Sequence, residues 1–485
     1  MNLFFFGHDE KYAVEQTMLT LFPQERPVYP DTPPEGDNTL ILTFSPGETW
    51  CTVTARLRRD GQEHLRRCRV RTADLPEHDP VLARRRKRRT LQRAFYLAAV
   101  DHLGKEPPWG MLSGVRPVKI PTRAMAAGAT PVQAEAMLRD QYRVSPLRRQ
   151  LAMDCAQASL KVQRSLKPEE LSLYVGIPFC PTRCAYCSFI SASGSANRLI
   201  PAYLEALLRE IDAAGASLLA AGRRVRSIYI GGGTPTTLSA VQLRTLLDRL
   251  HTAFQLPAGI EFTVEAGRPD TITRDKLEAI RDGGGNRISV NPQTMSDSVL
   301  EAIGRSHRSA DIQAAYALAR ETQVGAINMD LIAGLPTDTL AGFQATIDAV
   351  VALDPENITV HTLALKKGAR LRQNPETLPS GETVAQMLAY AWDVLRASGY
   401  EPYYLYRQKF MSGSFDNVGW CKPGFVNEYN ICMMEELHTV LSLGAGGVTK
   451  TIEGGKVCRH SNPKYPQEYL RDSADITAEK ASWTK

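Results

Sequence analysis

The sequence predicts an α/β fold whose centre is a partial (β/α)6 barrel, preceded by an α+β domain and followed by an irregular cap. Two observations support this prediction. From Leu171 onward, short apolar segments alternate with amphipathic segments of helical period, a pattern typical of parallel βαβ units. Cysteines, glycines and charged residues gather at the ends of the apolar segments, where a barrel carries its chemistry.

Six segments are expected to form the parallel strands: 171–177, 225–232, 260–266, 286–292, 326–334 and 357–364. The helices between them are expected at 201–220, 240–254, 274–284, 310–323 and 340–353. These elements assign residues 167–399 to the barrel. Residues 400–485 are rich in Tyr, Gly and Asn at their start and are expected to cap the open face of the barrel.

Residues 1–166 are expected to form an accessory domain. Segments 39–47 and 49–57 alternate like paired strands, and segments 81–110 and 130–145 have helical character. The first of these helices begins with the basic run Arg84–Arg89. A solvated basic face is the preferred interpretation, and contact with RNA or with an acidic electron donor remains open.

The protein is expected to be a monomer, and its composition predicts that it is soluble and cytoplasmic. The nine cysteines are an odd number without a disulfide pattern, which indicates reduced thiols. The start of the chain has no basic lead-in before its apolar run, and no stretch reaches the roughly 20 apolar residues of a membrane span. A net charge of +6 is mild and does not favour a nucleic acid partner.

The segment "YVGIPFCPTRCAYCSF" places Cys180, Cys184 and Cys187 in a C-x3-C-x2-C pattern just after a predicted strand. A structural zinc site needs four ligands, and a thioredoxin-like motif uses two cysteines. Three buried thiols without a metal are the remaining simple alternative. An iron–sulfur cluster held by three thiolates would leave one iron open, and this interpretation is preferred.

The triplet, with Tyr186 before its last cysteine, resembles the radical S-adenosylmethionine (SAM) superfamily. "YVGIPFCPTRCAYC", "GGGTPT", "NRISVNPQT", "NMDLIAGLP" and the spacing of Arg305 are similar to the oxygen-independent coproporphyrinogen III oxidase family. "PPWGMLSGVRPVKI" resembles its Firmicutes-type coproporphyrinogen dehydrogenase branch. The resemblance covers about residues 174–446 and, more weakly, the N-terminal domain.

The resemblance implies a 4Fe–4S cluster on the three cysteines, with SAM on its fourth iron. It implies one or two SAM molecules bound by residues at the strand ends: Tyr174, Tyr186, Gly232, Gly233, Thr234, Glu265, Gln293, Arg305 and Asp330. An ordinary glycine turn and solvated surface charges are the simple alternatives for these positions. The family's His two residues after the Tyr is replaced here by Gly176, and the Tyr-rich N-terminal segment of the enterobacterial enzyme is absent.

The implied activity is the oxidative decarboxylation of two propionates of coproporphyrinogen III, giving the vinyls of protoporphyrinogen IX in anaerobic haem biosynthesis. In the family, a deoxyadenosyl radical takes a hydrogen atom from the substrate, and a flavodoxin- or ferredoxin-like protein donates the electron. Arg370, Arg407 and Lys409 are candidates for binding the substrate carboxylates. The alternatives are a haem-binding trafficking protein, and a radical SAM methyltransferase, haem-degrading or tRNA-modifying enzyme.

Overall fold

The computed structural model divides the chain into two compact units. The first comprises residues 1–115 and 129–150, and the second 116–128 and 151–485. The structure describes all residues except 188–191, 366–368, 374, 409–414, 455 and 484–485. The boundary expected after residue 166 therefore lies earlier, because Val162 packs into a core with Tyr403 and Ile431. The expected boundary after residue 399 does not separate compact units, since residues 151–485 remain together.

The first unit has the α+β character that the sequence predicts. Its strands are β1 (Asn2–Phe6), β2 (Thr39–Ser45), β3 (Trp50–Arg59) and β4 (Gln62–Arg71), paired in the order β1-β2-β3-β4. Strand β1 is parallel to β2 and the other pairs are antiparallel. Helices α1 (Lys11–Leu21) and α2 (Pro80–Leu103) pack with one face of this sheet, and α4 (Pro131–Ala136) follows later in the chain.

The basic run at the start of α2 is bound to groups of its own unit. Arg84 and Arg88 both form ion pairs with the buried carboxylate of Glu10. Arg86 pairs with Asp74 at 3.0 Å. Three of the six basic side chains of the run therefore form ion pairs within the fold, which favours a structural role for those three.

All six predicted barrel strands are present, and their order in the sheet follows their order in the chain. They are β5 (Glu170–Ile177), β8 (Arg224–Gly232), β9 (Glu261–Glu265), β10 (Arg287–Ser289), β11 (Ala326–Ala333) and β12 (Asn357–Thr362). Each pairs in parallel with the next. Among the described residues the sheet stays open, so the barrel is partial, as predicted.

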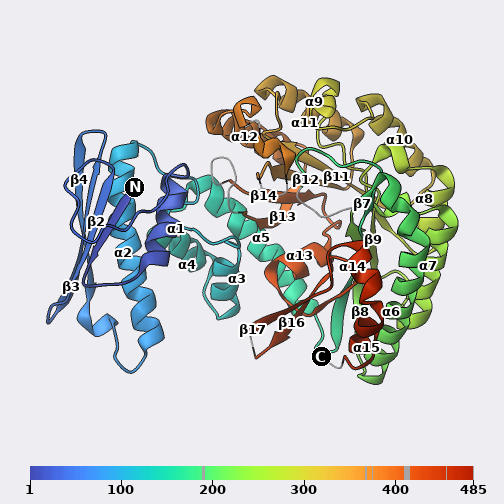
Figure 1. The fold of residues 1–485 in the computed structure, drawn as a ribbon, viewed down its shortest axis with the longest axis horizontal. Coiled ribbons are helices and arrows are strands. Elements are labelled where there is room, and N and C mark those ends of the chain that lie inside the picture. The colour runs from blue at the N-terminus through green and yellow to red at the C-terminus, as the bar shows by residue number, and fades with distance from the viewer. Residues whose placement is uncertain (188–191, 366–368, 374, 409–414, 455, 484–485) are drawn as a thin grey trace. The chain divides into compact units, whose positions relative to one another are not determined.

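Helices connect these strands on the outside of the curved sheet (Figure 1). The predicted ones are α6 (Ile200–Ala220), α7 (Ala240–Phe254), α8 (Arg274–Asp282), α10 (Ser309–Glu321) and α11 (Leu340–Leu353). The short α9 (Asp297–Ala302) was not predicted. Helices α3 (Lys119–Ala126), α5 (Pro146–Ser165) and α12 (Gly381–Ala397) complete the described helices before the C-terminal region. Among the described helices, none combines the length and apolar character needed to cross a membrane.

The expectation of an irregular C-terminal cap is corrected by the structure, because this region extends the central sheet at both edges. Strands β14 (Asn417–Cys421) and β13 (Glu401–Tyr406) continue it beyond β12, and β15 (Val440–Leu443), β16 (Val448–Glu453) and β17 (Lys456–Ser461) beyond β5. Helices α13 (Glu428–Glu435), α14 (Pro466–Arg471) and α15 (Ser473–Ala481) complete the region. Added strands satisfy backbone groups that an open sheet leaves unpaired at its edges.

Candidate active site

A pocket of about 540 Å³ lies at the carboxyl ends of the barrel strands in the second unit. All twelve site residues predicted from the sequence line it: Tyr174, Cys180, Cys184, Tyr186, Cys187, Gly232, Gly233, Thr234, Glu265, Gln293, Arg305 and Asp330. They come from segments up to about 150 residues apart, so only the fold brings them together. The roles assigned to them individually remain predictions.

One side of the pocket, here called the cysteine wall, consists of Cys180, Cys184, Cys187, Tyr186, Arg268 and Arg305. The hydroxyl of Thr234 lies 3.4 Å from Cys180 Sγ. The guanidinium of Arg268 donates to Thr182 Oγ1 at 3.0 Å and to Cys184 Sγ at 3.8 Å. The cysteine loop is therefore anchored both to the end of β8 and to the segment after β9.

Arg305 is the second buried cation of the cysteine wall, with 7% of its surface exposed. Its guanidinium donates to the carbonyl of Asn291 at 2.6 Å and to the hydroxyl of Tyr186 at 3.1 Å. Its Nε has no hydrogen-bond partner among the described residues. A buried donor of this kind favours an anionic ligand or sulfur atom nearby.

The donor set of this wall fits a cluster held by three protein thiolates. Cys180, Cys184 and Cys187 form no disulfide with any described residue and are half-buried. All three line the cavity, and within the described ranges no three Cys, His, Asp or Glu side chains are arranged to hold a metal ion. Two guanidiniums beside the thiols favour the negative charge that thiolates and sulfides carry.

Gly232, the last residue of β8, and Gly233, which follows it, lie close to the end of β5 and to the chain that leads from β5 to the first cysteine. A Cβ atom on Gly233 would lie 2.5 Å from the carbonyl oxygen of Phe179, which precedes the first cysteine. Gly232 has a φ of 109°, which favours glycine. A side chain at Gly233 would thus displace the cysteine loop as well as narrow the pocket.

The departure from the family pattern at Gly176 has a structural reason. A Cβ atom there would lie 2.6 Å from the carbonyl oxygen of Ala445, in the turn after β15. The carbonyl of Gly176 accepts a hydrogen bond from Tyr203 at 2.7 Å, and the same hydroxyl accepts one from the backbone of Ala445. The turn after β15 therefore occupies the space that a side chain at position 176 would need.

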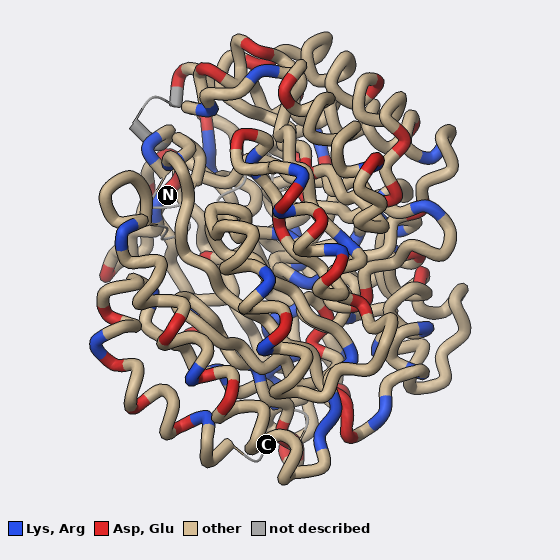
Figure 2. Tube along the Cα trace, turned by 90° about the vertical axis from the view of Figure 1, so that its right-hand side faces the viewer, with Lys and Arg blue, Asp and Glu red and all other residues tan. Residues whose placement is uncertain are grey.

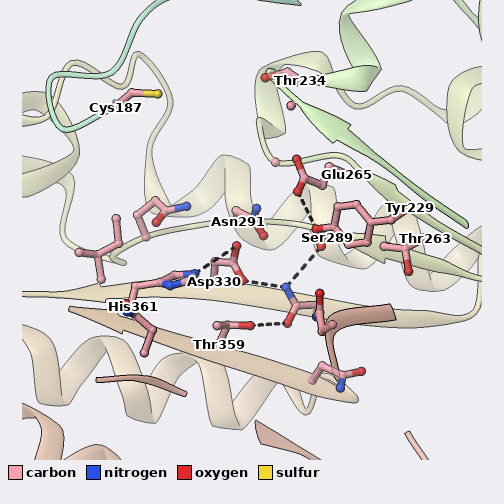
Figure 3. Close-up of a pocket in the computed structure, with 18 of the residues that line it drawn as sticks. Cys187, Tyr229, Thr234, Thr263, Glu265, Ser289, Asn291, Asp330, Thr359 and His361 are labelled. Carbon is pink, nitrogen blue, oxygen red and sulfur yellow. Dashed lines mark hydrogen bonds and ion pairs between the residues drawn. The ribbon is translucent and has the colours of Figure 1, made fainter. Parts of the chain in front are cut away.

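The opposite side of the pocket, here called the carboxylate wall, consists of Tyr229, Glu265, Asn328, Asp330 and His361. Figure 3 labels Tyr229, Glu265, Asp330 and His361. The hydroxyl of Tyr229 donates to Glu265 at 2.6 Å. Burial raises the pKa of Glu265 to about 7, and the negative charge of Asp330 adds to the effect. Glu265 thus changes its charge near neutral pH, unlike the solvated strand-end carboxylate that was the alternative.

Asp330 lies in β11 beside Glu265 but remains ionised. Burial alone would raise the pKa of Asp330, yet hydrogen bonds from His361 and Asn328 lower it below its usual value. The amide of Asn328 donates to Asp330 Oδ1 at 2.8 Å, and His361 Nε2 lies 3.7 Å from Oδ2. Two neighbouring carboxylates therefore differ in charge because their partners differ.

Gln293 is positioned by its backbone. Its amide donates to the carbonyl of Asp330, and its own carbonyl accepts from Ile332, at 2.9 and 3.0 Å. Its φ of 69° is uncommon for a residue with a side chain. The segment after β10 is thus pinned to β11, which holds Gln293 in the pocket lining.

Sequence reasoning missed several pocket residues. Arg268 and His361 follow or end predicted strands, so their positions alone could have identified them. Tyr404 and Tyr406 come from β13, for which no strand was predicted. The positions of Arg268 and His361 at barrel strand ends could therefore have identified them from the sequence. Tyr404 and Tyr406 could not be identified in this way, because they reach the pocket only through the pairing of β13 with β14.

Of the three candidates for binding substrate carboxylates, the two that the structure describes, Arg370 and Arg407, do not line the pocket. Arg370 is exposed and donates to the carbonyl of Arg183 in the cysteine loop at 2.7 Å. Arg407 is buried at the end of β13. Lys409 lies outside the described residues. Their assignment to substrate remains a prediction.

Comparison with known proteins agrees with this site. Residues 174–350 match the radical SAM superfamily. The chain is 34% identical to the oxygen-independent coproporphyrinogen-III oxidase-like protein HemZ of Bacillus subtilis, over 98% of this chain and 96% of that protein. The heme chaperone HemW of Escherichia coli is 28% identical over 64% of this chain and 80% of its own length.

A solved structure, that of coproporphyrinogen III oxidase HemN from Escherichia coli, a radical SAM enzyme, has a TM-score of 0.54. It is 28% identical and covers 66% of this chain and 73% of that chain. The fold and the three-cysteine pocket thus define a protein of the radical SAM superfamily. Within it, the chain belongs to the family of HemZ- and HemN-like proteins, whose cofactors are a 4Fe–4S cluster and SAM.

Proposed function

We propose that the chain is an oxidoreductase that converts two propionate groups of coproporphyrinogen III to vinyl groups. The observation that carries this proposal is the length of the match: the oxidase-like relative aligns with 98% of the chain, whereas the heme chaperone aligns with 64%. The match to the oxidase-like relative therefore includes the first unit of the chain. Cytoplasmic location and a flavodoxin- or ferredoxin-like donor are parts of the same proposal.

The reaction balances for each propionate as the loss of one hydrogen atom, one carbon dioxide and one electron, with formation of a carbon–carbon double bond. When bound, the cluster and SAM supply the one-electron chemistry that removes the hydrogen atom. The electron left on the substrate passes to an acceptor of the redox-protein or quinone class. The protein positions the reactants and excludes water, which is how a protein contributes to cofactor chemistry.

The residues of the pocket support these separate roles of the cofactors and the protein. The cysteine wall would hold the cluster, and its guanidiniums would favour the negative charge there. The carboxylate wall offers ionised Asp330 and titratable Glu265 to the ammonium and hydroxyl groups of SAM. Tyr404 and Tyr406 of β13 add apolar surface for a flat tetrapyrrole at the remaining side of the pocket.

The test is anaerobic incubation of the cluster-loaded protein with coproporphyrinogen III, SAM and a strong reductant, followed by mass analysis of the porphyrins. The expected products have lost one and then two carboxyl groups, together with release of deoxyadenosine. A Cys184→Ala variant serves as the inactive control. Cleavage of SAM without any decarboxylated product would contradict the substrate assignment while leaving the cofactor assignment intact.

A haem-binding trafficking protein is the second candidate, because heme chaperones are also relatives of the chain. Adding haem to the anaerobic protein and recording its absorption spectrum tests this candidate. Stoichiometric haem binding, transfer of that haem to an apo-haemoprotein and absence of decarboxylated product would together favour it. The residual alternatives, methyl transfer, haem degradation and tRNA modification, each predict a different product mass.

A further inference from the structure

The sheet of the first unit has a second face on which no helix of that unit packs. Side chains alternate between the two faces of a strand. One face carries Leu40, Leu42, Val53 and Leu57, which form a core with α2. Following the strand register, the other face carries a different set: Phe4, Phe6, Ile41, Thr43, Thr52, Thr54, Arg56, Arg58, Glu63, Leu65, Arg67, Arg69 and Arg71. This set is called the outer sheet face.

The outer sheet face has an excess of arginine. Its one acidic residue, Glu63, lies 2.7 Å from Arg58 and 3.6 Å from Arg56. Arg67 and Arg69 form no ion pair with any described residue. By contrast, Figure 2 shows basic and acidic residues intermingled along the outer helices of the second unit.

Large apolar side chains lie beside these arginines. Phe6 is 45% exposed and Leu65 is 41% exposed. The rings of Phe4 and Phe6 contact each other edge to face, with centroids 4.8 Å apart. At the end of the sheet, the guanidinium of Arg71 lies 5.4 Å from the centroid of the exposed Trp50 ring. Rings and guanidiniums thus share one open surface.

We propose that the outer sheet face binds single-stranded RNA. Guanidinium groups bind phosphate through paired hydrogen bonds, and exposed aromatic rings stack with unpaired bases. Arg67, Arg69 and Arg71 are alternate residues of β4, so they form a row with a repeat of about 6.6–6.8 Å. A regular row suits a repeating polyanion better than the scattered carboxylates of an acidic protein. This proposal stands independently of the reaction proposed for the pocket.

The experiment measures binding of the cluster-loaded full chain to a fluorescein-labelled single-stranded RNA of mixed sequence and about 12 nucleotides. Fluorescence anisotropy is recorded at several salt concentrations under anaerobic conditions. In the triple variant Arg56→Gln, Arg67→Gln, Arg69→Gln, affinity should fall at least about tenfold. The slope of log affinity against log salt should flatten by about 2, since each phosphate contact contributes about 0.7.

A matched control removes the same charge from the other side of the sheet. Replacing Arg85, Arg86 and Lys87 of α2 with Gln should change affinity less than about twofold, because these side chains lie on α2 and not on the outer sheet face. A further variant, Phe6→Ala, should weaken binding at unchanged salt slope, because stacking carries no charge. Circular dichroism of each variant reports whether the unit remains folded.

Three results would overturn the proposal. The first is no RNA binding by the parent chain at low salt. The second is equal loss of affinity in the sheet and helix triple variants, which would indicate unspecific attraction. The third is competition by polyglutamate as strong as that by unlabelled RNA, which would make an acidic protein the partner of this face.

Discussion

The two walls of the pocket carry opposite charge, although both are built from polar side chains at strand ends. The cysteine wall places Arg268 and Arg305, 3% and 7% exposed, beside sulfur atoms. The carboxylate wall places Glu265 and Asp330 beside a tyrosine and a histidine. The difference shows a pocket sorted for a ligand assembly that is anionic at one end and cationic at the other. A cluster with SAM bound to it has this character.

The largest effect is expected from removing a sulfur of the cysteine wall. Cys184→Ala should abolish the iron–sulfur absorbance of the anaerobic protein, because two thiolates do not retain a cluster that needs three. Iron content falls from about four per chain to near zero, measured by colorimetric iron assay. Cys458→Ala, at an exposed position of β17, is the matched control and should keep its iron. If the Cys184→Ala variant retained its cluster, Cys184 would not be a cluster ligand and the role assigned to the cysteine wall would be wrong.

A smaller effect is expected from removing the cation that anchors the cysteine loop. Arg268→Gln removes the 3.0 Å ion pair of Asp270 and one of the donors to Cys184. The free energy of unfolding should fall by about 2 kcal/mol, since breaking a largely buried pair costs several kcal/mol and Asp270 is partly solvated. Urea unfolding followed by circular dichroism measures it.

The surface provides a control for that prediction. Arg274 and Glu321 form a similar pair on exposed helices, where both side chains are more than half exposed. Arg274→Gln should change stability by less than about 0.5 kcal/mol. If Arg268→Gln and Arg274→Gln lower the free energy of unfolding equally, the ion pair of Arg268 contributes no more to stability than an exposed ion pair does.

The carboxylate wall should make SAM affinity depend on pH. Glu265 has a raised pKa of about 7, so it is neutral below that value and charged above it. If it contacts a cationic group of SAM, affinity should rise up to about tenfold between pH 6 and 7.5, before the SAM amine loses its own proton. Equilibrium dialysis with labelled SAM measures this rise. The rise should be absent in Glu265→Gln, and its persistence there would assign the pH dependence to another group.

The smallest effect is expected at His361. Its ring lies 3.7 Å from Asp330 and is itself partly exposed, so the interaction is screened by solvent. His361→Gln should weaken SAM binding only about twofold to threefold, because Asn328 still donates to Asp330. A loss as large as that of Asp330→Asn would instead place His361 in direct contact with the ligand.

The barrel was predictable strand by strand because its signal is local. Each of the six strands is an apolar run bounded by breakers, and each helix between them has its own amphipathic period. The C-terminal strands carry a weaker local signal, and their partners are far away in the chain. Strand β15 pairs with β5 more than 260 positions earlier, as in the register Val440 with Ser172. Strand β15 can pair only after the edge strand β5 of the central sheet is in place, so its pairing could not be predicted from the local sequence.

The sequence by itself determined the cysteine spacing, the glycine-rich strand end and the family that these motifs resemble, since all of them are written in contiguous residues. Only the tertiary structure decided that Arg268 reaches Cys184, that Glu265 and Asp330 share a wall, and that the basic run of α2 pairs with Glu10. The physical reason is that charge and pKa depend on burial and on neighbours. Neighbours distant in the chain are brought into contact only by folding.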